Sequence, residues 1–427
     1  MASHGAKKIP RLLSLYCLLI LFYAYNAVTV KKLGTRMLVG QSKRKRSLHS
    51  KRQQESKVDA INEKEQAVRG KFVSKFEDII TSDVDNNETA KFAAILLKQG
   101  KIYCRSSQRA HLSRGRHFVQ MLQRGLLDQQ GGITADSLKF DLPVLLKHDD
   151  SSGCNPATLT DAYQFPRLTW AVPVNNTANQ WCNVVGAPSY KAWRTLKQKV
   201  SWETMFRRNE KLYPWSNKQK KAVWRGSTTS NKGMYGQLEL LETPRGILVQ
   251  NGINNSLMDV GFHKIVGKYE RERTPVDHNL LKDPIPLEKM MKYKAIFDID
   301  GNNWSARFNN LLCYNSVIIK IAPDFVEANF KGLIPGVHYL PAMLDNITQV
   351  AEFVMDKDND VKMQQVVANA NAWCKENTMR EKMARSAIDA IEEYRVLLND
   401  YDEQWHEDWH NRKVFDEIDD LVECNII

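Results

Sequence analysis

Hydrophobic positions between residues 220 and 345 come in short runs of strand length, separated by mixed polar intervals. The clearest runs are KAVWRGS (221–227), GILVQNG (246–252), YKAIFDID (293–300) and SVIIKIA (316–322). From Gln349 to about Asn411 the apolar spacing is helical, without an internal Pro or Gly. The alternation of strands and helices predicts α/β units around a mostly parallel sheet, followed by a helical segment.

The preceding region mixes both periodicities. Helical spacing is seen in RHFVQMLQRGLLD (116–128), whereas FDLPVLL (140–146) and RLTWAVPV (167–174) have the character of strands, and the spacing from about Asp59 to Leu97 favours helix. At 427 residues the chain is long enough for two domains. We therefore predict an N-terminal domain over residues 71–215, a C-terminal domain over 216–400 and a C-terminal helical tail over 401–427.

The N-terminus contains one long apolar run, Leu12–Val30, with nineteen residues and no charge. That length can cross a bilayer, and it is long for the apolar region of a cleaved signal peptide. We predict a cytoplasmic tail over residues 1–11, a transmembrane signal anchor over 12–30 and a basic stem over 31–70. A cleaved signal peptide is the alternative. The positive-inside rule conflicts with a lumenal C-terminal side, because three basic residues precede the span and ten follow it closely.

The net charge of +12 is confined to this N-terminal region. Residues 1–30 contribute +3 and residues 31–58 contribute +9, so residues 59–427 are neutral. A neutral globular part gives no support for a nucleic-acid partner. The KRKR run at 43–46 could be a nuclear localisation signal, but a membrane anchor directly upstream argues against it.

Cysteines and glycosylation sequons favour an oxidising lumen. Six of the seven cysteines lie outside the apolar run, an even number that suits disulfides, although the pairing is not readable. Sequons occur at Asn87, Asn175, Asn254, Asn303 and Asn346, which gives weak support for the same compartment.

One stretch, KYKAIFDIDGNNWSARFNNLLCYNSVIIKI (292–321), predicts a buried strand, a turn at Asp300-Gly301, a short helix and a second strand. Ser305 stands where a helix N-cap is expected, and Arg307 follows in the predicted first turn. Free N–H groups, the positive end of a helix and a guanidinium together suit an anion. In an open α/β sheet, ligands bind at the carboxyl ends of strands, where this loop is predicted to lie.

A second stretch, WRGSTTS (224–230), has the same character. A predicted strand ends at Arg225, Gly226 and Ser227, and further hydroxyl residues follow. Two arginines at neighbouring strand ends could hold one diphosphate, because guanidinium groups make bidentate contacts with phosphate oxygens. The two loops together therefore favour a nucleotide-diphosphate site.

These blocks, with DVGF (259–262) and VHYLP (337–341), resemble glycosyltransferase family 90, which includes fungal capsule-associated proteins and protein O-glucosyltransferases. The resemblance covers about residues 200–400, and IDGNNWSARF is its most specific block. It implies a GT-B fold with two Rossmann-like domains facing a cleft. It also implies an inverting, metal-independent transfer from a UDP-sugar, with glucose or xylose likeliest by family, to a hydroxyl of a protein or glycan.

The resemblance also implies roles for individual residues. Arg225 and Arg307 would hold the diphosphate, with Gly226, Ser227, Asp300, Gly301 and Ser305 forming the rest of the donor site. Inverting transfer needs a base that takes the acceptor proton. The matching position is Asp149 in VLLKHDD, with Asp150 as its rival. No cofactor or metal is expected, and the implied location is the endoplasmic reticulum or Golgi membrane, single-pass type II, with a lumenal catalytic domain.

The sequence departs from the family pattern in two places. Gly336 stands where an aromatic residue usually precedes the VHY block. No cysteine lies between Cys182 and Cys313, so the usual upstream partner is missing and Cys313 could be a buried apolar thiol. A degenerate, non-catalytic relative acting as a lectin or scaffold therefore remains the alternative function.

Three further motifs suggest metal chemistry, each weakly. Asp298 and Asp300 form a D-x-D that would share one face of a strand, as in metal-dependent transferases of another fold. HEDWH (406–410) matches the H-E-x-x-H zinc motif of a hydrolase but lies in an acidic polar segment without an apolar face. Asp356-x-Asp358-x-Asp360 lacks the glycine and the glutamate of a calcium loop, and we reject it.

Overall fold

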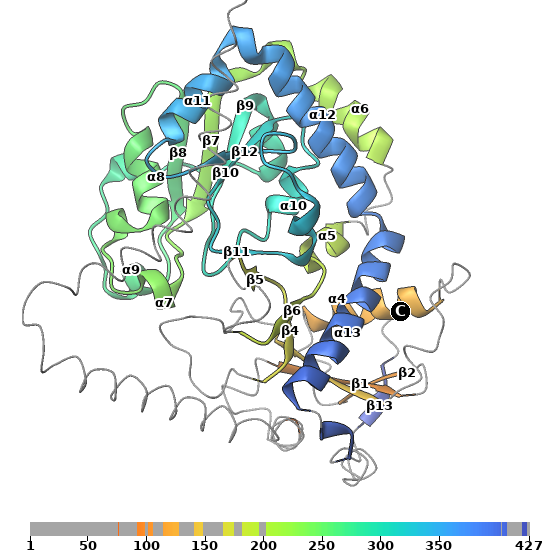
Figure 1. The fold of residues 1–427 in the computed structure, drawn as a ribbon. Coiled ribbons are helices and arrows are strands. Elements are labelled where there is room, and N and C mark those ends of the chain that lie inside the picture. The colour runs from red at the N-terminus through yellow and green to blue at the C-terminus, as the bar shows by residue number, and fades with distance from the viewer. Residues whose placement is uncertain are drawn as a thin grey trace, which may run out of the picture. The chain divides into compact units, whose positions relative to one another are not determined.

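The computed structural model describes the chain in segments (Figure 1). The described residues are 76, 92–98, 101–105, 114–127, 141–147, 165–174, 182–195, 202–402, 404–407 and 421–424. Every described residue lies in one compact unit of the chain, Val68–Ile427. The predicted tail, anchor and stem lie outside the described residues. None of the helices that are described is long and apolar enough to cross a bilayer.

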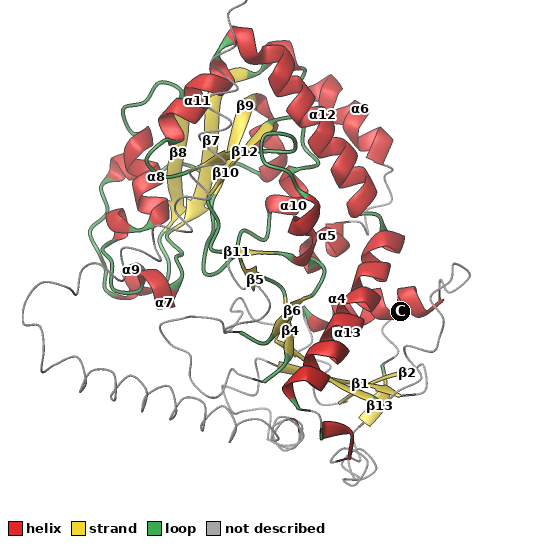
Figure 2. Ribbon diagram, in the orientation of Figure 1, coloured by secondary structure: helices red, strands yellow, loops and turns green. Residues whose placement is uncertain are grey.

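Five parallel strands form the sheet of the C-terminal half, in the order β12-β10-β9-β7-β8 (Figure 2). Their bounds are β7 Gln219–Ser227, β8 Met258–Lys264, β9 Tyr293–Asp298, β10 Val317–Ile321 and β12 Leu340–Ala342. In chain order the first strand lies beside the second and the third, so the winding direction reverses between β7 and β9. That topology is one of the doubly wound α/β orders.

Helices cover both faces of this sheet. Their bounds are α6 Trp202–Leu212, α7 Lys232–Tyr235, α8 Pro244–Gly252, α9 Lys268–Arg271, α10 Phe308–Leu311, α11 Ile347–Met355 and α12 Asp360–Asn377. Trp224 and Phe297 face a core shared with α8 and α11. Val223 and Ile296, one position earlier on the same strands, face a core shared with α10 and α12. Successive side chains of a strand point to opposite faces of the sheet, and helices cover both faces. Consecutive positions of these strands are therefore apolar.

One predicted strand of this half is a helix. GILVQNG lies within α8, although its apolar run has the length of a strand. The helix starts at a cap, because Thr243 Oγ1 accepts a hydrogen bond of 3.1 Å from the Gly246 amide, and Pro244 occupies the first helical position. The capping residues outweigh the β propensity of the run.

The described strands of the N-terminal half form a six-stranded sheet in the order β13-β2-β1-β3-β4-β6. Its strands are β1 Phe92–Lys98, β2 Lys101–Arg105, β3 Leu142–Lys147, β4 Arg167–Thr169, β6 Val184–Gly186 and β13 Leu421–Glu423, and the short strand β5 Val172–Pro173 pairs with β11 Phe325–Val326. β1 is antiparallel to both neighbours, whereas β3, β4 and β6 are parallel. The sheet is therefore mixed, and the helix predicted up to Leu97 gives way to β1.

The C-terminal end of the chain completes this N-terminal half. Helix α13 (Arg380–Tyr401) packs against α4 (Gly115–Leu127), and α5 (Tyr190–Thr195) adds to the same core. Strand β13, within the predicted helical tail, pairs with β2 and is the edge strand on that side of the described sheet. The predicted boundary at residue 400 therefore separates segments that pack together.

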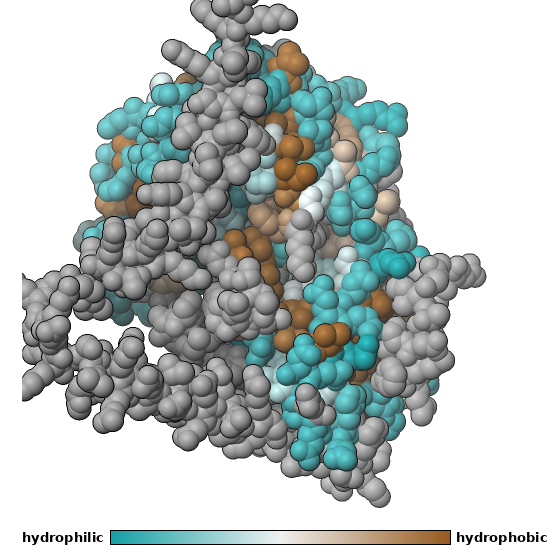
Figure 3. All heavy atoms as spheres, in the orientation of Figure 1, coloured by the Kyte–Doolittle hydropathy of each residue, from teal (hydrophilic) through white to brown (hydrophobic). Residues whose placement is uncertain are grey.

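On the face shown in Figure 3, hydrophobic residues occur in separate groups among hydrophilic ones.

Disulfides link distant parts of the chain. Cys104 is bonded to Cys424, and Cys313 to Cys374, so the prediction of a free buried thiol at Cys313 is wrong. The sequence offered no upstream partner because the partner lies downstream, on α12. Cys182 is also disulfide-bonded. These bonds suit the oxidising compartment that the even cysteine count predicts.

Candidate functional site

A pocket of about 400 Å³ lies at the carboxyl ends of the parallel strands, beside the point where the winding direction reverses. Ligands of doubly wound sheets bind at such a point. Its lining comes from the segments after β7, β9, β10 and β12 and from the start of α8: Thr229, Ser230, Asn231, Tyr235, Pro244, Arg245, Ile299, Asp300, Gly301, Asn303, Ile321, Ala322, Asp324, Met343, Leu344 and Asp345.

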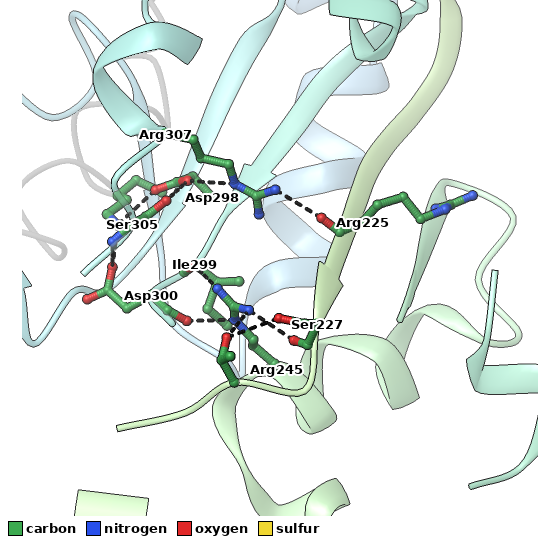
Figure 4. Close-up of polar contacts among 10 residues, drawn as sticks. Arg225, Ser227, Arg245, Asp298, Ile299, Asp300, Ser305 and Arg307 are labelled. Atoms are coloured by element: carbon green, nitrogen blue, oxygen red, sulfur yellow. Dashed lines mark hydrogen bonds and ion pairs between the residues drawn. The ribbon is translucent and has the colours of Figure 1, made fainter. Parts of the chain in front are cut away.

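Arg245 is the central cation of this pocket, and sequence reasoning missed it. Its Nε donates to the Asp300 carbonyl at 2.8 Å, and its Nη1 donates to the Ser227 carbonyl and to Thr229 Oγ1 at 2.9 and 2.6 Å (Figure 4). These bonds join the loops after β7 and β9 through one side chain. The only sequence signal is an arginine directly after the Thr-Pro start of α8.

Arg307 lies close to Arg245. Its Nη1 donates to the Arg225 carbonyl at 2.9 Å, and its Nε lies 3.6 Å from Asp298 Oδ1. The Nη2 atom is buried and has no hydrogen-bond partner among the described residues. Both guanidinium groups lie over the Trp224 ring, at 5.4 Å for Arg245 and 5.8 Å for Arg307. A buried donor without a partner costs free energy that an anion could recover.

The D-x-D carboxylates have cationic partners within the protein. Lys320 Nζ lies 2.8 Å from Asp298 Oδ2 and 2.8 Å from Asp300 Oδ1. The Asp298 side chain is fully buried and also contacts Ser305 Oγ, and the Ser305 amide donates to Asp300 Oδ1. As predicted, the two carboxylates share one face. Because Lys320 and Arg307 already offset their charge, the pair is poorly suited to a divalent cation.

The pKa shifts indicate a site with uncompensated positive charge. Burial, followed by the charge of Arg307, lowers the pKa of Arg245 to about 9. Partial burial lowers the pKa of His263, and Arg307, Arg245 and Arg225 lower it further. Guanidinium groups nevertheless stay protonated in proteins, so Arg245 and Arg307 keep their positive charges in this buried setting.

Arg225 has a different environment from the one predicted. Its guanidinium points away from Arg245 and Arg307 in Figure 4. Nη2 forms a 2.9 Å ion pair with Asp259 Oδ1, and Nε donates to the Asp283 carbonyl at 3.0 Å. Arg225 lies within β7 and not after its end, so its side chain bonds to Asp259 on the neighbouring strand β8. The structure does not bring this guanidinium to the pocket, whereas its carbonyl holds Arg307.

The other predicted donor-site residues also fall into two groups, those at the pocket and those away from it. Asp300 and Gly301 line the pocket, and the Ser227 carbonyl holds Arg245. Gly226 lies against Trp224, where a Cβ would be 2.2 Å from the ring. Ser305 is not a helix cap: α10 begins at Phe308 and spans four residues, and Arg307 occupies its N-cap position. The predicted helix end therefore contributes little, and side chains form the cationic site.

Other predicted residues lie outside this site. Asp149 and Asp150, the predicted base and its rival, lie outside the described residues. Of HEDWH, the structure describes His406 and Glu407, and His406 Nε2 is 3.1 Å from Asn399 Oδ1. Asn303, the asparagine of one predicted sequon, is buried and only 4% exposed. Its Oδ1 accepts a hydrogen bond from the Asn231 side-chain amide, so Asn303 is a poor glycosylation acceptor.

Fold and site together define an α/β protein with an arginine-lined pocket at the carboxyl ends of a parallel sheet. The sequence profile of glycosyl transferase family 90 matches residues 74–413. The chain belongs to this family, as the sequence motifs predicted.

Curated relatives match part of the chain. Protein O-glucosyltransferase 1 of Homo sapiens is 24% identical over 194 residues, covering 45% of this chain and 46% of that relative. The Mus musculus protein is 27% identical over 154 residues, 36% of each chain. O-glucosyltransferase rumi of Drosophila melanogaster is 25% identical over 170 residues, covering 39% of this chain and 38% of the relative. The chain thus spans less than half of these relatives' length.

Proposed function

We propose that this protein is an inverting, metal-independent glycosyltransferase of GT-B architecture that moves a sugar, glucose or xylose, from a UDP-sugar to a hydroxyl of a protein or glycan. The observation that carries the proposal is the pair Arg245 and Arg307 beside a pocket of about 400 Å³ at the switch point of the sheet. The names of the relatives support glucose and a protein acceptor.

In this proposal Arg245 and Arg307 hold the diphosphate, and Asp300 and Gly301 shape the floor of the pocket. The leaving UDP develops negative charge as the glycosidic bond breaks, and two fixed guanidinium groups stabilise that charge without a metal ion. Asp149, or its neighbour Asp150, would take the acceptor proton. The disulfides support a location in the secretory pathway, which we propose is the lumenal side of the endoplasmic reticulum or Golgi membrane.

The test is UDP-sugar hydrolysis by the purified full-length chain in the presence of EDTA, across UDP-glucose, UDP-xylose, UDP-galactose and UDP-N-acetylhexosamines. We expect turnover of one donor, and loss of at least about a hundredfold of it in Arg307→Ala, the scale of removing a charge-stabilising donor. Arg385→Ala, which changes an exposed arginine on α13, is the matched control.

Two outcomes would count against the proposal. Turnover that EDTA abolishes would exclude the metal-independent mechanism. UDP binding without turnover of any donor, in the presence of candidate acceptors, would favour the non-catalytic alternative.

A further inference from the structure

Glu327 is a buried carboxyl outside the pocket, at a point where the two halves of the chain touch. It follows β11, which pairs with β5 of the N-terminal half, and it precedes the short helix Ala328–Gly332. Only 5% of its surface is exposed. No ion pair joins it to any of the residues that the structure describes.

The neighbours of Glu327 come from three elements. The Asn309 side-chain amide, on α10, donates to Glu327 Oε2. Ser189, directly before α5, and Trp304, in the loop after β9, lie near enough to favour the charged form of its carboxyl group and so to lower its pKa. Oε1 of Glu327 and the indole N–H of Trp304 both lack a partner within hydrogen-bond distance in the described part of the chain. The charged groups that act on it are Lys191 of α5 and Lys320 of β10.

This environment disfavours a carboxylate. A buried charge without a paired cation is costly, and Lys320 is already engaged by Asp298 and Asp300. Burial accordingly raises the pKa of Glu327 to about 8, while Ser189, Trp304 and the two lysines act in the opposite direction. A neutral carboxylic acid can accept a hydrogen bond from the Asn309 amide and donate one through its own O–H. The hydroxyl group of the neighbouring Ser189 suits that O–H as an acceptor.

The residues that Glu327 contacts flank the donor-site cation. Asn309 and Trp304 stand two positions after and three positions before Arg307 on the same connection between β9 and β10. Trp304 also packs into the core of the N-terminal half, so this connection is held from both sides.

We propose that Glu327 is a positioning residue: as a neutral carboxylic acid it fixes the Trp304–Asn309 segment, and with it Arg307, and its ionisation loosens donor binding. The proposal rests on the proposed function, because it assumes that Arg307 contacts the donor. Glu327 itself does not line the pocket, so it acts through Arg307 rather than on the substrate.

The experiment measures the Kd of UDP by calorimetry for the full-length protein between about pH 6 and about pH 10, for wild type, Glu327→Gln and Glu352→Gln. Glutamine mimics the neutral acid, and Glu352 is an exposed glutamate on α11. Because the phosphate and the uracil of UDP titrate in this range, each Kd is divided by the Glu327→Gln value at the same pH. We expect this ratio to rise about tenfold with a midpoint near pH 8 for wild type and for the Glu352→Gln control. The thermal unfolding midpoint at each pH separates loosening from global unfolding.

A second variant keeps the test decisive if Glu327→Gln does not fold. Ser189→Ala removes the neighbour that most favours the charged form, so the midpoint of the wild-type pH profile should move to higher pH. UDP binding with the same pH profile in wild type, Glu327→Gln and Ser189→Ala would overturn the role of Glu327 and leave the donor site intact. Absence of UDP binding at every pH would instead overturn the proposed function and the positioning role with it.

Discussion

The arginines show what a residue-level pattern can and cannot predict. Arg225 and Arg307 both follow the pattern of an anion site, but only Arg307 lies beside the pocket cation Arg245. The motif places Arg225 near a strand end without fixing the direction of its side chain, which Asp259 on β8 determines. Arg245 stands on another element, so no single motif contains it.

Gly301 offers a direct test of this arrangement. A Cβ there would lie 2.9 Å from Arg245 Nη2 and 3.2 Å from Thr229 Oγ1, so the end of the Arg245 side chain would have to move. We expect Gly301→Ala to displace Arg245 and weaken UDP binding about tenfold, or about 1.4 kcal/mol, measured by calorimetry. Gly267→Ala is the control, since its strain at φ 71° affects stability with no pocket contact. Unchanged UDP affinity in Gly301→Ala would contradict the account.

At the scale of elements, the sequence predicts the C-terminal sheet well. β7, β9 and β10 appear where strong apolar runs occur, and the helical segment from Gln349 onward becomes α11, α12 and α13. The failures have local causes. GILVQNG is a helix because Thr243 and Pro244 start one, and α10 is shorter than its amphipathic pattern because Ser305 is engaged by Asp298.

Asp259 ties together the strands on which the pocket depends. Its carboxylate accepts from Arg225 on β7, Lys282 Nζ at 2.8 Å and Tyr293 Oη on β9 at 2.6 Å. Burial alone would raise the pKa of Asp259, but the bonds from Lys282, Tyr293 and Arg225 outweigh it and hold the pKa well below its usual range. The carboxylate therefore acts as a structural clamp rather than a catalytic group.

A lowered folded-state pKa means that Asp259 stabilises the protein above its unfolded pKa and loses this contribution as pH falls through the folded value. We expect Asp259→Asn to lower the thermal unfolding midpoint near neutral pH and to lose less stability than wild type on acidification. Melts of both proteins across acidic pH, with exposed Asp389→Asn as control, measure this. Parallel pH profiles for wild type and Asp259→Asn would show that Asp259 carries no such clamp.

At the scale of the molecule, the sequence did not reveal which segments share a core. Strand β13 pairs with β2 across more than three hundred residues, and Cys104 and Cys424, separated by 320 positions, are bonded beside it. α13 likewise packs on α4. Periodicity reports local structure, whereas strand order and pairing depend on contacts between distant residues, so the mixed N-terminal sheet could not be predicted.

The candidate site was predictable to a similar degree. The motifs lie in the loops after β7 and β9, which meet because motif residues at strand ends converge in a parallel sheet. Asp300 and Gly301 line the pocket, and the donor-binding roles of Ser227, Asp300, Gly301 and Arg307 stay predictions. The sequence could not identify Arg245 or Glu327, since both act through elements that only the tertiary fold brings to these loops.

We propose that Arg245 and Arg307 form a metal-independent site for a nucleoside diphosphate. The most direct measurement is calorimetric titration of UDP and UMP into the full-length protein with EDTA, comparing wild type with Arg245→Ala and Arg385→Ala. We expect wild type and Arg385→Ala to bind UDP alike, and Arg245→Ala to lose at least about tenfold in UDP affinity and less in UMP affinity. Equal UDP affinity in wild type and Arg245→Ala, or no UDP binding by wild type, would contradict a diphosphate site at these two arginines.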